Sequence, residues 1–215
     1  MKNKKMIYSL EENADMTLEQ YPREDENSTN FGNVWFANDK IFIRVPEIIE
    51  PEFYNFVSSF LLDVVISHNK SDIILLVDSL GGDLASTLGV YSLLEAMENK
   101  IITVAFNMCC SAACILFALG KERYFLKDTV YIIHQIRTSI YTESQVQTTQ
   151  VKKIADSLEA CQNDYRKIIM KKTKIPKDKL DVIFSSVEDT RFKSEEIIAY
   201  NIATKVFKKF SSIPL

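Results

Sequence analysis

The sequence predicts a single α/β domain in which helices pack against a sheet of buried strands. Short, continuous apolar runs typical of strands alternate with longer segments of helical periodicity. A chain of 215 residues is large enough to bury such a core without disulfides or a structural metal. Hydrophobic residues make up 47% of it and charged residues 26%, a balance that is ordinary for a water-soluble globular protein.

The first elements are predicted from changes in residue composition and apolar periodicity along the chain. Residues 1–38 are polar and acidic without sustained periodicity, so we expect a flexible N-terminal arm, followed by one folded domain over 39–215. A β-rich run predicts a strand at Lys40–Val45, and apolar residues at helical spacing predict a helix at Glu52–Ser67. The continuous apolar run Ile73–Val77 is typical of a strand buried on both faces.

The same alternation continues to the end of the chain. Asp83 is placed to cap the N-terminus of a helix whose apolar face includes Leu84 and Leu88. Strands and helices are then expected, in chain order, at Ile101–Phe106 (strand), Ser111–Leu119 (helix), Arg123–Leu126 and Val130–Ile133 (strands), and Glu143–Lys172, Pro176–Phe184 and Ser194–Tyr200 (helices).

Charge and cysteine usage narrow the classes of partner. The net charge of −3 provides no basic field, so neither nucleic acid nor an anionic membrane is expected as a partner. Cys109, Cys110 and Cys114 fall in one apolar run, which suits small buried side chains better than disulfides, and no paired C-x-x-C motifs suggest zinc. The N-terminus lacks the apolar core of a signal peptide, and no apolar stretch reaches the roughly 20 residues of a membrane span. We expect a reducing, cytoplasmic location.

Of the two histidines, only one lies where functional side chains are common. His68 lies in the polar segment SHNKSD and is expected to be a solvated loop residue. His134 follows the apolar run VYII, beyond the end of an expected buried strand, which is a frequent position for functional residues in α/β proteins. On its own, this position fits a structural histidine as well as a general base.

Two further segments could carry chemistry. Ser111 lies between an expected strand and an expected helix among small residues, where free N–H groups and a helix dipole would suit a nucleophile. The same position also fits an ordinary small helix residue. Gly81 and Gly82 likewise follow a strand and precede a helix, so their amides could form a tight turn, a phosphate cradle, a peptide-binding edge or an oxyanion site. No P-loop lysine or G-x-G-x-x-G pattern supports the phosphate reading.

Four motifs occur in order along the chain: DSLGGD, MCCSAACILFALG, YIIHQ and EDTRFKSEEIIAY. Their order and spacing resemble the motif series of the ClpP family, the proteolytic subunits of the ATP-dependent Clp protease, over about Lys40 to Val206. The interval from Ser111 to His134 resembles the shorter, phage-associated members. The resemblance implies a ClpP/crotonase-like fold of stacked β-α-β units with a long protruding helix.

The resemblance also implies a serine endopeptidase that hydrolyses unfolded proteins or peptides inside a self-compartmentalised ring. Ser111 matches the nucleophile, His134 the general base and Asp189 the acid that orients this base. By the same resemblance, the backbone amides of Gly82 and Ala112 match the oxyanion donors. The substrate-binding segments contain Gly81 and Ile136.

The partners implied by the resemblance are further copies of the chain and an ATPase. Family members form stacked heptameric rings, fourteen subunits in all, fed by an AAA+ unfoldase of the ClpX or ClpA type. The long helix at Glu143–Lys172 would suit the contact between rings, although a helix packed only within its own chain fits the pattern equally. No cofactor is implied.

Several positions depart from the family pattern. Leu80 and Ile136 replace usual prolines, the segment 137–141 replaces a Gly-rich stretch, and Asn201 replaces a glycine. Because of these departures, a second hypothesis is that the chain is a catalytically impaired ring or scaffold subunit. A third alternative is an acyl-CoA enzyme of the crotonase type, which has a similar fold and needs no Ser-His-Asp set. A Ser-Lys signal-peptide peptidase is disfavoured, since no membrane segment is expected.

Overall fold

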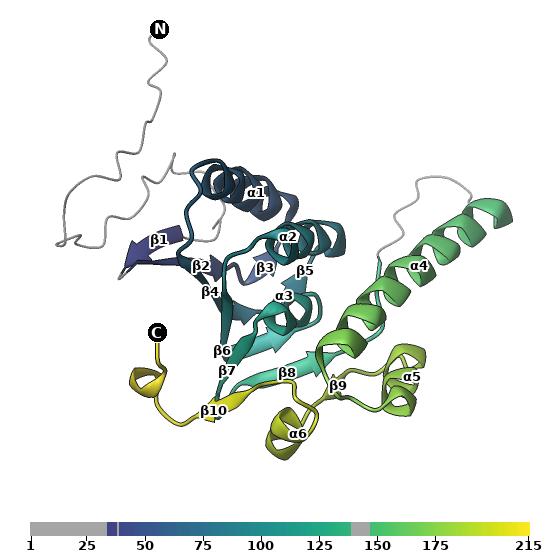
Figure 1. Ribbon diagram of the computed structural model, residues 1–215. Coiled ribbons are helices and arrows are strands. Elements are labelled where there is room, and N and C mark those ends of the chain that lie inside the picture. The colour runs from purple at the N-terminus through teal and green to yellow at the C-terminus, as the bar shows by residue number, and fades with distance from the viewer. Residues whose placement is uncertain (1–33, 38, 139–146) are drawn as a thin grey trace, which may run out of the picture.

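The computed structural model describes residues 34–37, 39–138 and 147–215. At its centre is an eight-stranded sheet in the order β1-β2-β4-β6-β7-β10, and β8 and β9 extend it from β6 (Figure 1). The strands of this sheet are β1 (Val34–Ala37), β2 (Lys40–Val45), β4 (Asp72–Ser79), β6 (Ile101–Cys110), β7 (Glu122–Leu126), β8 (Val130–Ile133), β9 (Thr190–Arg191) and β10 (Lys205–Phe207). Strands β3 (Ile48–Ile49) and β5 (Gly81–Gly82) form a small parallel pair of their own.

Six α-helices and one 3-10 helix complete the described part of the chain. They are α1 (Pro51–Ile66), α2 (Leu84–Ala96), α3 (Ala113–Leu119), α4 (Thr148–Lys172), α5 (Lys177–Ser185), α6 (Ser194–Ala199) and η1 (Phe210–Ser212). Helices α1, α2 and α3 lie together on one side of the sheet, and the C-terminal segment runs along the other (Figure 1). This is the mixed α/β architecture that the sequence predicts.

The interior has two apolar clusters, one on each face of the sheet. The larger one joins the helices to the sheet, and every side chain of α3 belongs to it. The smaller cluster lies under the C-terminal residues and includes Ile74, Val104 and Phe207. Both faces of β4 are therefore covered, and Ile73–Val77 are all buried, as the continuous apolar run predicts.

A bulge in β6 divides this strand between two partners. Its first half pairs with β7 over Ile102–Ala105, and its second half pairs with β8 over Met108–Cys110. Between them Asn107 adopts a positive φ of 63°, and Asp78 Oδ1 accepts hydrogen bonds from Asn107 Nδ2 (2.9 Å) and from the amide of Met108 (3.2 Å). The bulge therefore allows β8 to join the sheet beside the end of β6.

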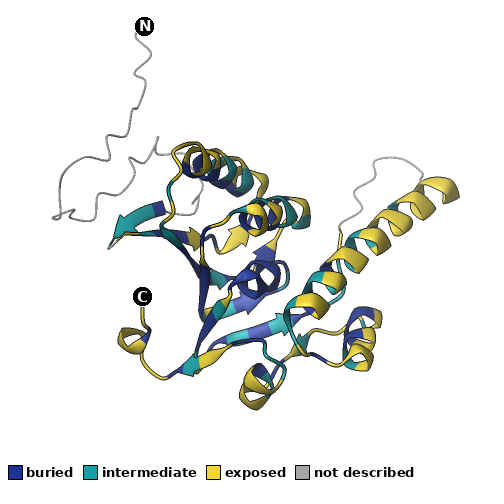
Figure 2. Ribbon diagram, in the orientation of Figure 1, coloured by how far each residue is buried: buried dark blue, intermediate teal, exposed yellow. Residues whose placement is uncertain are grey.

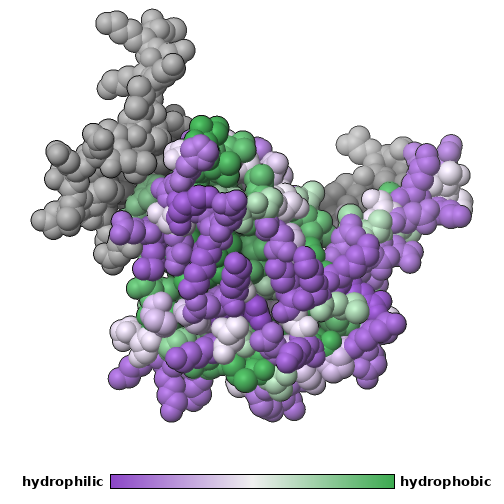
Figure 3. Space-filling view, in the orientation of Figure 1, coloured by the Kyte–Doolittle hydropathy of each residue, from purple (hydrophilic) through white to green (hydrophobic). Residues whose placement is uncertain are grey.

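Helix α4 projects from the body of the domain. Of its 25 residues only Tyr165 and Ile169 are buried. Figure 2 shows most of the helix exposed, and Figure 3 shows polar side chains along its outer length. The structure starts this helix at Thr148 with Gln147 as its cap, later than the Glu143 start expected from the sequence, and residues 143–146 lie outside the described residues.

The remaining boundaries correct the sequence expectations in detail. The arm expected over 1–38 is too long, because Val34–Ala37 pairs with β2 as an antiparallel strand and Val34 is buried; residues 1–33 lie outside the described residues. Strand β6 extends four residues past the expected end at Phe106, since the bulge lets it continue. Strands β3, β5, β9 and β10 are only two or three residues long, and no pattern predicted them.

Candidate active site

Ser111 occupies a sharp turn between β6 and α3. It has a positive φ of 54°, a conformation that costs a non-glycine residue about 1–3 kcal/mol. Its amide donates to Ile132 O (2.9 Å), and its carbonyl oxygen accepts from Cys114 N (3.0 Å). A strained serine in a strand–turn–helix is the geometry of a nucleophile elbow. The side chain is half-buried, as a nucleophile that must meet a substrate requires.

Gly81 abuts this turn, and the next residue, Gly82, packs against the backbone of β3. Gly81 has φ 94°, and a Cβ atom there would lie 2.8 Å from Ser111 Cβ and 2.9 Å from Ala112 N. Gly82 has φ 147°, and its Cβ would lie 2.1 Å from Ile49 O. Only glycine fits either position, so the backbone of β5 comes against the start of α3 without side chains between them.

The start of α3 provides the other backbone donor expected here. Ala112 is buried and is the N-cap residue of α3, so its amide precedes the hydrogen-bonded turns of the helix. Gly82, in contrast, is exposed. The two predicted oxyanion donors thus come from β5 and from the start of α3, two backbone segments that meet at Gly81.

His134 and Asp189 are brought to the same edge by strand register. In the parallel pair of β6 and β8, Cys110 lies opposite Ile132, so Ser111 and His134 both lie just beyond the paired residues. In the antiparallel pair of β8 and β9, Ile133 lies opposite Thr190, which places His134 and Asp189 at the next position outward. The sheet therefore gathers all three predicted residues, although up to 78 positions of sequence separate them.

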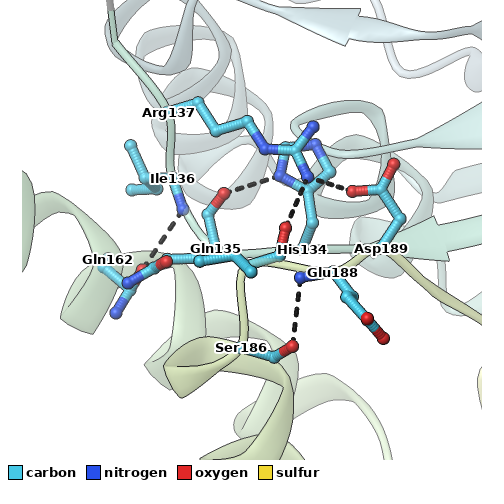
Figure 4. A network of polar contacts seen from close by, with 9 residues as sticks. His134, Gln135, Ile136, Arg137, Gln162, Ser186, Glu188 and Asp189 are labelled. Atoms are coloured by element: carbon cyan, nitrogen blue, oxygen red, sulfur yellow. Dashed lines mark hydrogen bonds and ion pairs between the residues drawn. The ribbon is translucent and has the colours of Figure 1, made fainter.

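The hydrogen bonds of a Ser-His-Asp triad are not formed in this arrangement. Nδ1 of His134 lies 2.6 Å from the carbonyl oxygen of Gln135, and Asp189 Oδ1 accepts a hydrogen bond from Arg137 Nη2 (Figure 4). Within the described residues, no hydrogen bond joins the side chains of Ser111, His134 and Asp189 to one another. The backbone thus places the three residues at one edge, while the acid and the base are each bonded elsewhere.

Helix α4 contacts the backbone of the Ser111 turn, of the segment after His134 and of α5, the helix that precedes Asp189. The hydroxyl of Tyr165 donates to Ser111 O (2.8 Å). The Gln162 side chain accepts from Ile136 N (3.2 Å) and donates to Phe184 O (3.0 Å), next to the loop that carries Asp189. The amide of Ile136, a predicted substrate-binding residue, is therefore used by Gln162, and only its carbonyl could pair with a peptide.

The cysteines beside Ser111 are packing residues, as the sequence predicts. Cys109, Cys110 and Cys114 are buried, and all four cysteines, Cys161 included, are free thiols. Burial, and next the neighbouring Cys114, raises the pKa of the Cys110 thiol to about 11. A protonated thiol is a poor nucleophile, so Cys110 is a weaker candidate nucleophile than Ser111.

The described residues give little support for a metal site, a membrane span or a second pocket near Ser111. No group of three His, Cys, Asp or Glu side chains lies close enough to hold a metal ion across 34–37, 39–138 and 147–215. Within the same ranges, no helix is long and apolar enough to cross a membrane. A surface hollow of about 580 Å³ lies between the start of β8 and α6, lined by residues such as Asp128, Thr129 and Lys193, away from the turn at Ser111.

Sequence reasoning missed the residues that tie the site together. In the sequence, Arg137 belongs to a segment that replaces a Gly-rich stretch of the family pattern, and no pattern links it to Asp189. Tyr165 belongs to an apolar stripe that predicts its burial, which the structure confirms, but helical spacing predicts neither its hydrogen bond to Ser111 nor the contacts of Gln162. His68 is exposed in a turn with φ 54°, in agreement with its expected role as a solvated loop residue.

Comparisons with known proteins agree with this geometry. A model of the Clp protease family matches residues 24–210, which include every site residue named above. The sequence is 26% identical over 196 residues to ATP-dependent Clp protease proteolytic subunit 2 of Treponema denticola, covering 89% of this chain and 94% of that protein. The same subunit of Borreliella burgdorferi is 26% identical over 153 residues, 60% of this chain and 73% of that protein. The chloroplastic proteolytic subunit 6 of Arabidopsis thaliana is 32% identical over 111 residues, 51% of this chain but only 40% of the plant protein.

Proposed function

The chain belongs to the Clp protease family, and from this premise we propose that it is a serine endopeptidase with Ser111, His134 and Asp189 as its catalytic triad. The observation that carries the proposal is the strained turn at Ser111. A residue type that tolerates positive φ poorly occupies this position, directly against Gly81, which has no side chain and so lets the backbone of β5 approach the start of α3. Such a turn presents a nucleophile beside donors for an oxyanion.

The proposed reaction is acyl transfer to Ser111 followed by hydrolysis. His134 takes the hydroxyl proton as Oγ attacks the carbonyl carbon of the peptide, and the amides of Gly82 and Ala112 stabilise the resulting oxyanion. The intermediate collapses, the C–N bond breaks, and His134 returns the proton to the leaving amine. A water molecule, deprotonated by the same imidazole, then cleaves the acyl-enzyme ester and restores Ser111.

Asp189 has the role of orienting His134 in this scheme. Its carboxylate would accept the Nδ1–H of the imidazole and stabilise the imidazolium that forms during attack. This requires Asp189 to give up its bond to Arg137, and His134 Nδ1 to turn from Gln135 O. Both groups lie at adjacent strand positions, so side-chain rotation can bring them together without moving the sheet.

The quaternary context extends the proposal. We propose that copies of the chain assemble into stacked heptameric rings, served by an AAA+ unfoldase of the ClpX or ClpA type and degrading unfolded polypeptides in the cytoplasm. The projecting, polar helix α4 is suited to contacts between rings, and the free cysteines are suited to a reducing compartment. The relatives are named as subunits of ATP-dependent proteases, which supports an ATPase partner.

The test is active-site labelling of the full chain with a fluorophosphonate probe, together with cleavage of a fluorogenic peptide. The wild type should be labelled at Ser111 and should cleave the peptide, and Ser111→Ala should do neither while keeping its oligomeric state. Ser59→Ala, at an exposed serine of α1, is the matched control and should behave as the wild type. If Ser111→Ala and the wild type turn over the peptide equally fast, the serine mechanism is ruled out.

The Arg137–Asp189 pair favours a second candidate, a ring subunit that has lost catalysis. Absence of Ser111 labelling in a folded oligomer, with wild-type assembly, is the result that candidate predicts. The family match gives no support to the acyl-CoA alternative, because the matching family is one of proteases.

A further inference from the structure

Arg137 and Asp189 form an ion pair at the edge of the candidate active site. The Arg137 Nη2 atom donates to Asp189 Oδ1 and lies 3.4 Å from the carbonyl oxygen of Val187. One guanidinium group thus contacts both ends of the three-residue segment that delivers the acid. Figure 4 shows the carboxylate directed toward this guanidinium. A charge-assisted hydrogen bond of this kind is stronger than one between two neutral groups.

The general base is occupied as well. His134 Nδ1 is the atom that the acid of a Ser-His-Asp triad orients, and here it lies 2.6 Å from Gln135 O. The register of β8 and β9 nevertheless brings His134 and Asp189 to neighbouring positions. The acid therefore has two candidate partners within reach, the imidazole of His134 and the guanidinium of Arg137.

We propose that Arg137 is a positioning residue that acts through Asp189: its guanidinium competes with His134 for the carboxylate and lowers the fraction of protomers with an assembled triad. This inference rests on the proposed serine mechanism. It assigns a role to a residue that the resemblance to the family leaves without one. Two arrangements are then in equilibrium, one with Asp189 bonded to Arg137 and one with Asp189 bonded to His134.

The exposure of the pair sets the size of the effect. The Arg137 side chain is 56% exposed and that of Asp189 is 47% exposed. Water and salt screen such a pair, so Arg137 biases the equilibrium by a small factor and does not block it. Loss of the guanidinium should accelerate reaction at Ser111 by roughly two- to fivefold, the range that an exposed ion pair allows.

The experiment measures the rate constant of fluorophosphonate labelling at Ser111 for the full chain and three variants. Arg137→Gln removes the charge, and its Ser111 should be labelled roughly two- to fivefold faster than in the wild type. Arg137→Lys keeps a cation and should stay close to the wild-type rate. Arg44→Gln changes an exposed arginine on β2 and should equal the wild type. Thermal unfolding and sedimentation establish that each variant keeps its fold and assembly.

The dependence of the labelling rate on ionic strength provides a second test of the same equilibrium. Raising the ionic strength from about 0.1 M to about 1 M shortens the Debye length from about 10 Å to about 3 Å. The wild-type rate should rise toward that of Arg137→Gln, and the Gln variant should respond much less. Equal or slower labelling of Arg137→Gln, or a salt response shared by both proteins, would overturn the role of Arg137 while leaving the serine mechanism intact. Absence of Ser111 labelling in every variant would instead contradict the proposed function, and this inference with it.

Discussion

Tyr165 of α4 donates its hydroxyl hydrogen to the carbonyl oxygen of Ser111 across 2.8 Å, although 54 positions of sequence separate the two residues. The ring of Tyr165 is buried and packs edge-on against Phe184 at the end of α5. The projecting helix is therefore anchored at its inner end to the turn that carries the proposed nucleophile. This contact joins the part of the domain suited to assembly with the part suited to chemistry.

Removing that hydroxyl should cost little stability. In Tyr165→Phe, Ser111 O still accepts from Cys114 N at 3.0 Å, so no carbonyl is left without a partner. We expect a loss of about 1 kcal/mol in the free energy of unfolding, measured by urea denaturation. Tyr54→Phe, at a half-buried tyrosine of α1, is the control and should change less. A loss confined to the control would contradict the role of this contact.

A methyl group at Gly81 should disrupt the site. Gly81→Ala would strain a residue at φ 94° and bring Cβ to 2.7 Å from Cys110 O. We expect a destabilisation of at least about 2 kcal/mol together with loss of Ser111 labelling.

The matched variant for this prediction is Gly89→Ala in α2. Its Cβ would come within 2.5 Å of Cε2 of Tyr54, so this half-buried side chain must turn, whereas the atom met at Gly81 is backbone. Alanine is otherwise favoured over glycine in a helix by about 1 kcal/mol. Similar losses of stability in both glycine variants would argue against a special requirement at Gly81.

Gln162 should matter for both stability and reactivity. Leucine in its place leaves Ile136 N and Phe184 O without their partner on α4, which should cost about 1–3 kcal/mol. We also expect slower labelling of Ser111, since both bonds fix segments that carry His134 and Asp189.

Gln162→Glu separates the two bonds. It keeps the acceptor for Ile136 N and loses the donor to Phe184 O, so an intermediate labelling rate is expected. Asn163→Leu changes an exposed neighbour on the same helix and should leave the rate unchanged. If Gln162→Leu loses stability but its folded form labels at the wild-type rate, the residue is structural alone.

The Cys110 thiol gives a prediction for alkaline pH. Its pKa is about 11 in the folded protein against an ordinary value of 9.0, chiefly because of burial. The unfolded chain therefore releases this proton at lower pH than the native state does, and the stabilisation present below pH 9 is lost as the pH rises toward 11. The free energy of unfolding should fall over this range in the wild type and fall less steeply in Cys110→Ala. Cys110→Ala should still be labelled at Ser111. Loss of this labelling would indicate that the Cys110 thiol takes part in the reaction.

Periodicity and turn residues predicted most of the framework because they report local physical preferences. The run Ile73–Val77 is a buried strand, Asp83 caps α2 by accepting a hydrogen bond from Ser86 N (2.7 Å), and α1 lies within one residue of its expected bounds. The sequence was less informative for β3 and β9, since two-residue strands owe their existence to their partners. The sequence also predicted too early an end for β6, because the continuation of this strand depends on Asp78 of the neighbouring strand β4.

The α/β class, the family and the three residues proposed to carry catalysis follow from the amino-acid sequence, because apolar spacing and an ordered series of motifs are local properties of the chain. The groups that contact those residues follow from the folded arrangement: Arg137 bonds to Asp189, Gln135 lies beside His134, and Tyr165 donates to Ser111. Hydrogen bonds and ion pairs between distant segments depend on strand register and helix placement, and no local pattern in the sequence encodes them.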